Sequence, residues 1–187
     1  VLRGATDGAD AAFRQGGRSG DASWRVYGKM LQRGHSETGD GRRIHDAWRQ
    51  AQLGFRADWE HGADRFSVNG NAYRGEPEQP EPGEISVTGT SLRLGELDTA
   101  GANLTARWER TLADGASLSV QAYLDHARRE VPPTFTDSMQ IADLQFQHTL
   151  PAWGRHSLVW GANLRHSWDE VDLSLIHISE PTRRRGI

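Results

Sequence analysis

Apolar and polar residues alternate one by one along several segments of the chain. In Gln50 to Trp59 the apolar side chains Leu53 and Phe55 share one side with Trp59, while polar residues occupy the other side. Such a period of two is typical of β-strands with two different faces. The clearest further segments are Trp24–Met30, Phe66–Tyr73, Ala102–Glu109, Ser117–Asp125, Ala142–Gln147 and Leu158–Leu164. With Ala11–Gly17, where the alternation is poorer, the pattern predicts about eight strands.

The segments between these strands alternate between short and long. Short connections rich in Gly, Asp or Pro are typical of hairpin turns, and they are predicted at Arg18–Asp21, Glu60–Asp64, Leu112–Ala116 and Leu150–Gly154. Longer, more polar stretches are predicted as loops at Gly34–Ala47, Gly75–Ala100 and Glu130–Ser138. Transmembrane β-barrels have short turns on one side of the membrane and longer loops on the other. The order of connections therefore favours an antiparallel, up-and-down transmembrane β-barrel.

The length of the strands and the position of the tryptophans support the same fold class. Several strands reach about ten residues, which is one bilayer crossing and longer than strands in most soluble sheets. Four tryptophans near strand ends are predicted to be interfacial aromatics: Trp24, Trp48, Trp59 and Trp108. A soluble sandwich also alternates along each strand and is the alternative.

Composition excludes several classes of protein. No run of about 18 apolar residues occurs, so a membrane-spanning helix is not expected. The chain has no Cys, which excludes disulfide frameworks and thiolate metal sites. Its net charge is −3 with basic and acidic residues interspersed, so no nucleic-acid partner is expected. The 21 Gly and 7 Trp residues favour β structure with tight turns.

The C-terminal segment Leu173–Arg183 resembles the translation of an adapter used in preparing sequencing libraries. We therefore expect 173–187 to be a non-native tail and exclude it from fold reasoning. A genuine basic C-terminus is the alternative.

Three segments, Ser23–Lys29, Trp48–Trp59 and Gly101–Trp108, resemble early barrel strands of TonB-dependent outer-membrane receptors. The likeness spans roughly Ala11 to Asp172. It implies a 22-stranded barrel plugged by an N-terminal domain. We interpret residues 1–10 as the end of that plug or a linker and 11–172 as a partial barrel of about eight strands.

The resemblance also implies a function. TonB-dependent receptors import siderophores, cobalamin or similar scarce ligands across the Gram-negative outer membrane, with energy from the TonB complex. The expected partners are therefore outer-membrane lipid, the TonB complex through the N-terminal part of a receptor, and a metal chelate or other small ligand. No cofactor or bound metal is expected. Two alternatives stay open: another outer-membrane barrel, such as a porin or barrel enzyme, and a soluble carbohydrate-binding β-protein.

Two sets of polar residues are candidates for ligand contact. The first lies in one proposed external loop and consists of His35, Glu37, Asp40 and His45, whose spacing matches no metal motif. The second is predicted to face the barrel lumen and consists of Arg25, Lys29, Arg56, Asp58, Arg107, Glu109, Asp143 and Arg165. For the first set the alternative is a solvated loop, and for the second a wall without specific contacts.

No catalytic residues are predicted. Asp125 and His126 are neighbours, but adjacent residues on a strand point to opposite faces and cannot share a site. The common hydrolase, nucleotide-binding and zinc-protease motifs do not occur in the sequence. We therefore expect a protein that is not an enzyme.

Overall fold

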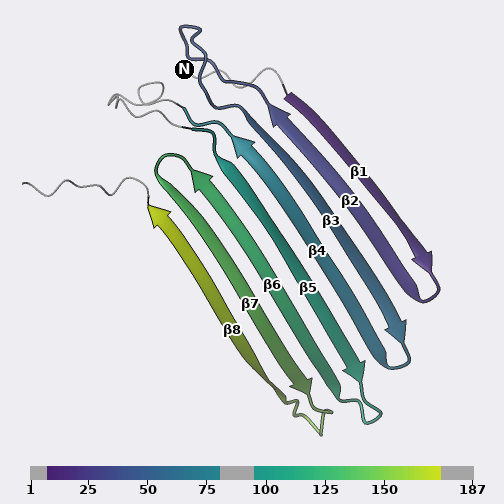
Figure 1. Cartoon of the computed structure of the whole chain (residues 1–187). Helices are drawn as coiled ribbons and strands as arrows, with labels where there is room; N and C mark the ends of the chain where they lie inside the picture. The colour runs from purple at the N-terminus through teal and green to yellow at the C-terminus, as the bar shows by residue number, and fades with distance from the viewer. Residues whose placement is uncertain (1–7, 81–94, 174–187) are drawn as a thin grey trace, which may run out of the picture.

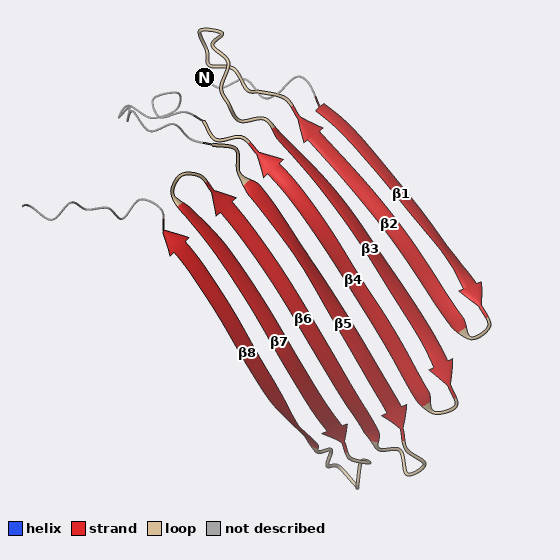
Figure 2. Ribbon diagram, viewed as in Figure 1, coloured by secondary structure: helices blue, strands red, loops and turns tan. Residues whose placement is uncertain are grey.

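Eight antiparallel strands form one sheet in which each strand lies beside its neighbour in the sequence (Figure 1). The structure is a computed structural model that describes residues 8–80 and 95–173. These residues contain strands and connections but no helix, as Figure 2 shows. The strands are β1 (Gly8–Ser19), β2 (Ala22–Arg33), β3 (Trp48–His61), β4 (Asp64–Pro77), β5 (Asp98–Thr111), β6 (Ser117–Val131), β7 (Phe135–Thr149) and β8 (Val159–Leu173).

The predicted all-β, up-and-down architecture with about eight strands is confirmed. Each strand is longer than the segment in which alternation is clear, and β3 for example runs to 14 residues. Pairing continues past the alternating core because charged residues at the strand ends still form the cross-strand ladder. Glu60, for example, pairs with Arg65 at the turn between β3 and β4.

Two hairpins close with two-residue turns, as predicted. Gly20 begins the turn between β1 and β2 with φ of 58°, and Gly62 begins the turn between β3 and β4 with φ of 60°. Positive φ at the first turn residue matches the right-handed twist of the flanking strands, and Gly adopts it without a steric penalty.

The predicted alternation of short and long connections is wrong for the last two hairpins. β6 continues to Val131 and β7 begins at Phe135, so three residues replace the long loop predicted at 130–138. The amide and hydroxyl of Thr134 both donate to the Val131 carbonyl at 2.7 Å, which closes this tight turn. Charge, Pro and Thr were interpreted there as signals of a long loop. Both prolines and Thr134 lie in the three-residue turn, whereas the charged residues Glu130 and Asp137 lie in the paired strand ends. The connection of β7 to β8 instead spans 150–158, longer than the turn predicted at 150–154.

The sheet is open within the described residues. β1 and β8 each have a strand on one side only, so the sheet is not closed into a barrel. β1 begins at Gly8, which places the last three residues of the predicted plug or linker in the sheet, and β8 ends at Leu173. The rest of the predicted linker, 1–7, and the adapter-like residues 174–187 lie outside the described residues.

No helix in the described part of the chain is long and apolar enough to cross a membrane.

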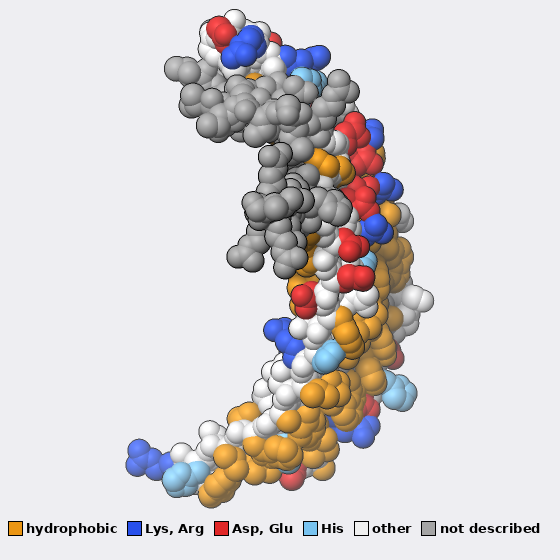
Figure 3. Space-filling model, turned by 60° about the vertical axis from the view of Figure 1, so that its left-hand side comes forward, with side chains coloured by type: hydrophobic (Ala, Val, Ile, Leu, Met, Phe, Trp, Pro, Cys, Tyr) orange, Lys and Arg blue, Asp and Glu red, His pale blue; other side chains and the backbone are white. Residues whose placement is uncertain are grey.

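The sheet is curved, and its two faces differ in chemistry and in burial. Figure 3 shows a crescent with hydrophobic side chains gathered along its outer side. On β6 the apolar residues Ala122 and Leu124 are exposed, while Gln121 and Tyr123 on the opposite face are half-buried. The polar face is therefore the concave one. Only Ile44, Ala116 and Val131 are buried hydrophobic residues among those described.

Candidate functional site

One face of the sheet, here called the apolar face, is covered by hydrophobic side chains from every strand. The hydrogen-bonded register brings them together, since Val26, Phe55 and Gly70 lie side by side on successive strands. The larger members of this face are Phe13, Trp24, Val26, Met30, Leu53, Phe55, Trp59, Phe66, Val68, Leu104, Trp108, Leu118, Val120, Leu124, Leu144, Phe146, Trp160, Leu164 and Trp168. Several are more than half exposed, including Leu53 at 62% and Leu164 at 72%.

An aromatic row crosses the apolar face near the short turns. Trp59 stacks on Phe66 with ring centroids 5.2 Å apart, and Phe66 lies opposite Trp108 on β5. The row continues on β7 with Phe146, whose ring meets Trp160 edge-on at 5.3 Å. Aromatic rows of this kind line the polar boundary of membrane barrels.

The four predicted interfacial tryptophans are not all in this row. Trp59 and Trp108 belong to it, and Trp24 lies one row further from the turns on the same face. Trp48 begins β3 with its side chain on the opposite, polar face, where the Arg33 guanidinium lies 5.7 Å from its ring centroid. The role predicted for these tryptophans remains a prediction.

Charged residues replace the apolar ones toward the long connections. Arg74 on β4 binds Asp98 at 2.5 Å and approaches Glu76 at 3.7 Å. Arg49 on β3 also pairs with Glu76, and Arg128 on β6 pairs with Glu130. On β3 the apolar stretch from Ala51 to Trp59 covers nine positions, within the 9 to 11 residues of a tilted barrel strand that crosses a bilayer.

The loop-side boundary of the apolar face differs between the strands. It lies after Met30 on β2. On β8 the apolar face includes Leu164 and, beyond His166, the half-exposed Trp168.

The second face, here called the polar face, carries all eight residues predicted to face a lumen. Arg25 and Arg56 lie directly opposite each other, and the same row ends with Asp143 and Arg165. Lys29, Asp58, Arg107 and Glu109 lie in neighbouring rows of this face. The structure therefore brings the whole set to one concave surface, while a lumen-lining role remains a prediction.

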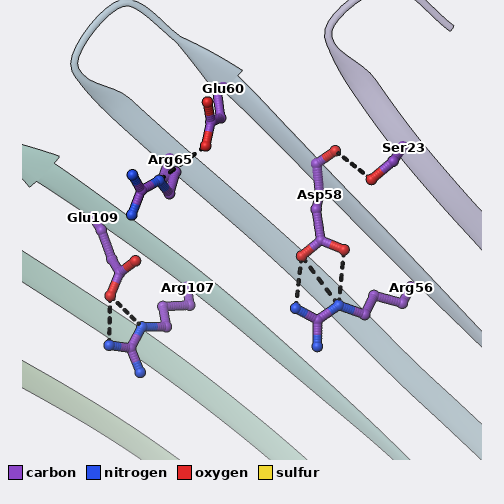
Figure 4. A network of polar contacts seen from close by, with 7 residues as sticks. All are labelled: Ser23, Arg56, Asp58, Glu60, Arg65, Arg107 and Glu109. Atoms are coloured by element: carbon purple, nitrogen blue, oxygen red, sulfur yellow. Dashed lines mark hydrogen bonds and ion pairs between the residues drawn. The ribbon is translucent and has the colours of Figure 1, made fainter. Parts of the chain in front are cut away.

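Ion pairs on the polar face form mostly along single strands, between residues two apart. The Arg56 guanidinium donates to the Asp58 carboxylate at 2.7 to 3.0 Å, and the Arg107 guanidinium donates to Glu109 at 2.6 Å (Figure 4). Arg65 bridges the turn to Glu60 at 2.9 Å. Exposed pairs of this type contribute about 0 to 1 kcal/mol each, so they organise the surface more than they stabilise the fold.

Further along the polar face, Asp143 collects two donors from β8. Arg165 Nε lies 3.1 Å and Asn163 Nδ2 lies 3.0 Å from its carboxylate oxygens. In the middle of the face Asn71 donates to Asn103 at 2.9 Å across β4 and β5. This surface of amides and ion pairs differs from the hydrophobic core of a soluble sheet protein, in which apolar side chains are buried.

The four loop residues proposed as ligand contacts do not converge on one point. The His35 and His45 rings meet edge-on with centroids 6.2 Å apart, and His35 Nδ1 lies 3.1 Å from the Ile44 carbonyl. Glu37 instead pairs through its backbone with Arg43 on the other arm of the loop. Within residues 8–80 and 95–173, no group of three or more His, Asp or Glu residues is arranged to hold a metal ion.

Asp40 lies near the tip of the same loop and has local partners only. The Thr38 hydroxyl donates to one carboxylate oxygen, and Arg42 Nε lies 3.1 Å from the other. These contacts, with the Thr38 hydrogen bond the larger cause, lower the pKa of Asp40 below its ordinary value. The contacts of this carboxylate therefore stabilise the conformation of the loop.

Hydrogen bonds join the three connections on the loop side. The Glu78 amide donates to the Ala47 carbonyl at 2.8 Å, and the Glu78 carboxylate lies 3.4 Å from His35. The Gln79 side chain donates to the carbonyls of Gly95 and Pro132 at 2.9 and 3.1 Å. The connections after β2, β4 and β6 therefore form one platform.

Sequence reasoning missed several members of these surfaces. Phe66, Phe146 and Trp160 complete the aromatic row, and their positions at strand ends were a usable signal. Arg14 on the polar face was missed because the alternation in the first strand is poor. Glu78, the partner of His35, had no signal, because the two belong to different loops.

The chain matches no known protein family, no curated protein and no solved structure.

Proposed function

We propose that the chain forms part of the wall of an outer-membrane β-barrel of the TonB-dependent receptor type, which imports a scarce ligand such as a siderophore or cobalamin. In this proposal the apolar face contacts lipid, and the polar face lines the barrel interior, which holds the plug and water. The long connections after β2 and β4 lie outside the cell and contribute to ligand capture. Energy comes from the TonB complex, and the chain performs no chemistry.

The observation that carries the proposal is the inverted distribution of hydrophobic side chains. Eighteen large hydrophobic residues are exposed, whereas three hydrophobic residues are buried in the described part of the chain. Exposed apolar surface of this extent requires a partner that removes it from water. Lipid is the partner that covers the outer side of a curved sheet without needing a matched protein surface.

The curvature favours lipid over a second protein layer. In a soluble barrel or sandwich the hydrophobic side chains fill the space that the sheet encloses. Here the enclosed, concave side carries Arg56, Asp58, Arg107 and Asp143 instead. The nine-residue apolar stretch on β3 and the aromatic row at its turn end both fit the dimensions of a membrane barrel.

The edges of the sheet fit the same proposal. β1 and β8 present unpaired backbone groups, which have no water to bind in a bilayer. Additional strands must therefore pair with both edges before the sheet is stable in lipid. A large barrel of which this sheet is one part supplies them.

Membrane insertion is tested with single cysteines, because the chain contains none of its own. Leu53→Cys places a label on the apolar face, and Gln52→Cys places a matched control label one residue away on the polar face. Because the sheet needs further strands at both edges, this and the other vesicle experiments use the complete gene product that contains it, with any cysteine outside this sequence replaced by serine. The urea-unfolded protein is diluted into phospholipid vesicles, and a polarity-sensitive fluorophore is read at each site. We expect a lipid environment at position 53 and a water environment at position 52.

Two outcomes contradict the proposal. Equal, aqueous signals at both positions in vesicles would show that the apolar face does not contact lipid. A label at position 53 that is protected from water without lipid would indicate a protein layer over the apolar face, as in a soluble carbohydrate-binding protein.

A receptor is distinguished from a porin or barrel enzyme by its energy requirement. Uptake or growth on a candidate chelate is measured for the complete gene product in cells with and without TonB. We expect TonB-dependent uptake. Passive diffusion in both strains would identify a porin, and turnover of a lipid or peptide substrate would identify an enzyme.

A further inference from the structure

Positive charge accumulates without partners on the polar face near the turn that joins β1 and β2. Arg14, Arg18, Arg25 and Lys29 make no hydrogen bond or ion pair through their side chains to any residue in the described ranges. All four are exposed. Most other arginines of this face are paired, as Arg107 is with Glu109.

One of these cations, Arg25, faces another cation directly. Arg25 on β2 and Arg56 on β3 are cross-strand neighbours in register. Like charges at such positions destabilise a sheet. Asp58 relieves part of this repulsion, but both of its oxygens already accept hydrogen bonds from Arg56, so the charge of Arg25 is left without a hydrogen-bonded anion.

A groove of about 420 Å³ lies over this pair, lined by Arg14, Ser23, Arg25, Arg56 and Asp58. Gly16 lies directly opposite Arg25 on β1, and without a side chain it leaves the surface beside the guanidinium open. The volume falls in the range of about 300 to 1,000 Å³ that is usual for sites of small molecules.

The other end of the polar face has the opposite balance of charge. β6, β7 and β8 carry four acidic and two basic residues on this face: Asp125, Asp137, Asp143, Asp169, Arg129 and Arg165. An anion on the concave surface is therefore repelled from β6–β8 and attracted to β1–β3. Sequences that break a local pairing rule without compensation tend to do so at functional sites.

We propose that Arg14, Arg25 and Arg56 bind the oxyanion group, carboxylate or phosphate, of a small solute in the groove over β1–β3. Guanidinium groups suit this role because their planar donors match oxyanions in pairs and keep their charge at all physiological pH values. The inference rests on the proposed function, because it requires that water and solutes reach the polar face. It adds that the solute is anionic.

Binding is measured on the complete gene product in phospholipid vesicles by calorimetric titration with inorganic phosphate and, separately, with citrate. Sodium chloride at the same ionic strength is the reference. We expect Arg25→Gln to weaken binding by roughly tenfold to a hundredfold, the effect of losing a charge-assisted hydrogen bond. The control Arg129→Gln removes a cation from the far end of the same face and should leave the affinity unchanged.

The stability of the protein is a second measurement, in which Arg25→Gln should be favourable instead of unfavourable. In chloride alone, Arg25→Gln should raise the urea midpoint of unfolding, because it removes the repulsion from Arg56. In phosphate the wild-type chain should gain stability that the variant does not gain. A residue with a purely structural role would lower the midpoint in both solutions.

Equal affinity of the wild type and Arg25→Gln overturns the proposal, as does equal weakening by Arg129→Gln or binding no stronger than that of chloride. These results are independent of the labels at positions 52 and 53. Membrane insertion without anion binding contradicts the anion site and leaves the membrane proposal standing. Anion binding by a chain that folds without lipid contradicts the membrane proposal and leaves the anion site standing.

Discussion

An arginine in the centre of the apolar face should destabilise the protein only where lipid covers that face. Leu104 lies at the midpoint of the apolar stretch of β5, between Gly70 and Leu124 on the neighbouring strands, and is 39% exposed. At the middle of a bilayer, arginine on the lipid side of a barrel costs about 2 to 4 kcal/mol. On a surface exposed to water the same substitution changes the free energy of unfolding by about 0.5 kcal/mol or less.

The matched control is Thr105→Arg, one residue further along β5 on the polar face. Thr105 lies opposite Asn69 and Tyr123, and its side chain makes no hydrogen bond to another described residue. An arginine there keeps its hydration, so the free energy of unfolding should change by about 0.5 kcal/mol or less.

Both variants are unfolded with urea in phospholipid vesicles, with tryptophan fluorescence as the signal. The cost of Leu104→Arg should also fall in vesicles with shorter acyl chains, because the headgroups then approach the guanidinium. Equal costs for Leu104→Arg and Thr105→Arg would refute the assignment of the two faces. A large cost at Leu104 that does not vary with bilayer thickness would refute lipid as the covering partner.

Three further outcomes follow from particular contacts. Trp108→Phe loses the hydrogen bond from Nε1 to Asp64 Oδ1 at 2.7 Å and should lower the free energy of unfolding by about 1 kcal/mol; no change in the urea midpoint would show that this bond is not formed. Gly54→Val places a side chain into the ring of Tyr27, its cross-strand neighbour, and should cost about 1 to 3 kcal/mol, with partial recovery on adding Tyr27→Ala as the check. Because the folded pKa of Asp40 is lowered, its stabilisation of the 34–47 loop is present at neutral pH and lost as the pH falls through that pKa; the protection factors of amide exchange, which are corrected for the intrinsic pH dependence, should fall on acidification in this loop but not in the strands, and Asp40→Asn should abolish that fall.

The strands were predictable because their signal is carried by the side chains themselves. A period of two sorts Leu53 and Gln52 onto different faces whatever the neighbouring strand is. All eight residues predicted for the polar face therefore lie on one surface in the structure. The aromatic row was partly predictable for the same reason, since it consists of strand-end residues.

Cross-strand partners and loop contacts were not predictable. The opposition of Arg25 and Arg56 depends on the register of β2 with β3, which turn geometry and the exact strand ends determine together. The contact between His35 and Glu78 joins two connections that are distant in the sequence. The tight turn after Val131 was predicted as a long loop, because charged residues also occur at the ends of paired strands and a three-residue turn accommodates both prolines.

The pairing order of the sheet bears on how such a chain changes in evolution. Every strand contacts only the strands before and after it in the sequence. Duplicating or deleting a hairpin at either edge thus leaves all remaining pairs in their original register. A sheet built in this way can grow by whole hairpins, and each addition changes the width of the sheet without redesigning the strands already present.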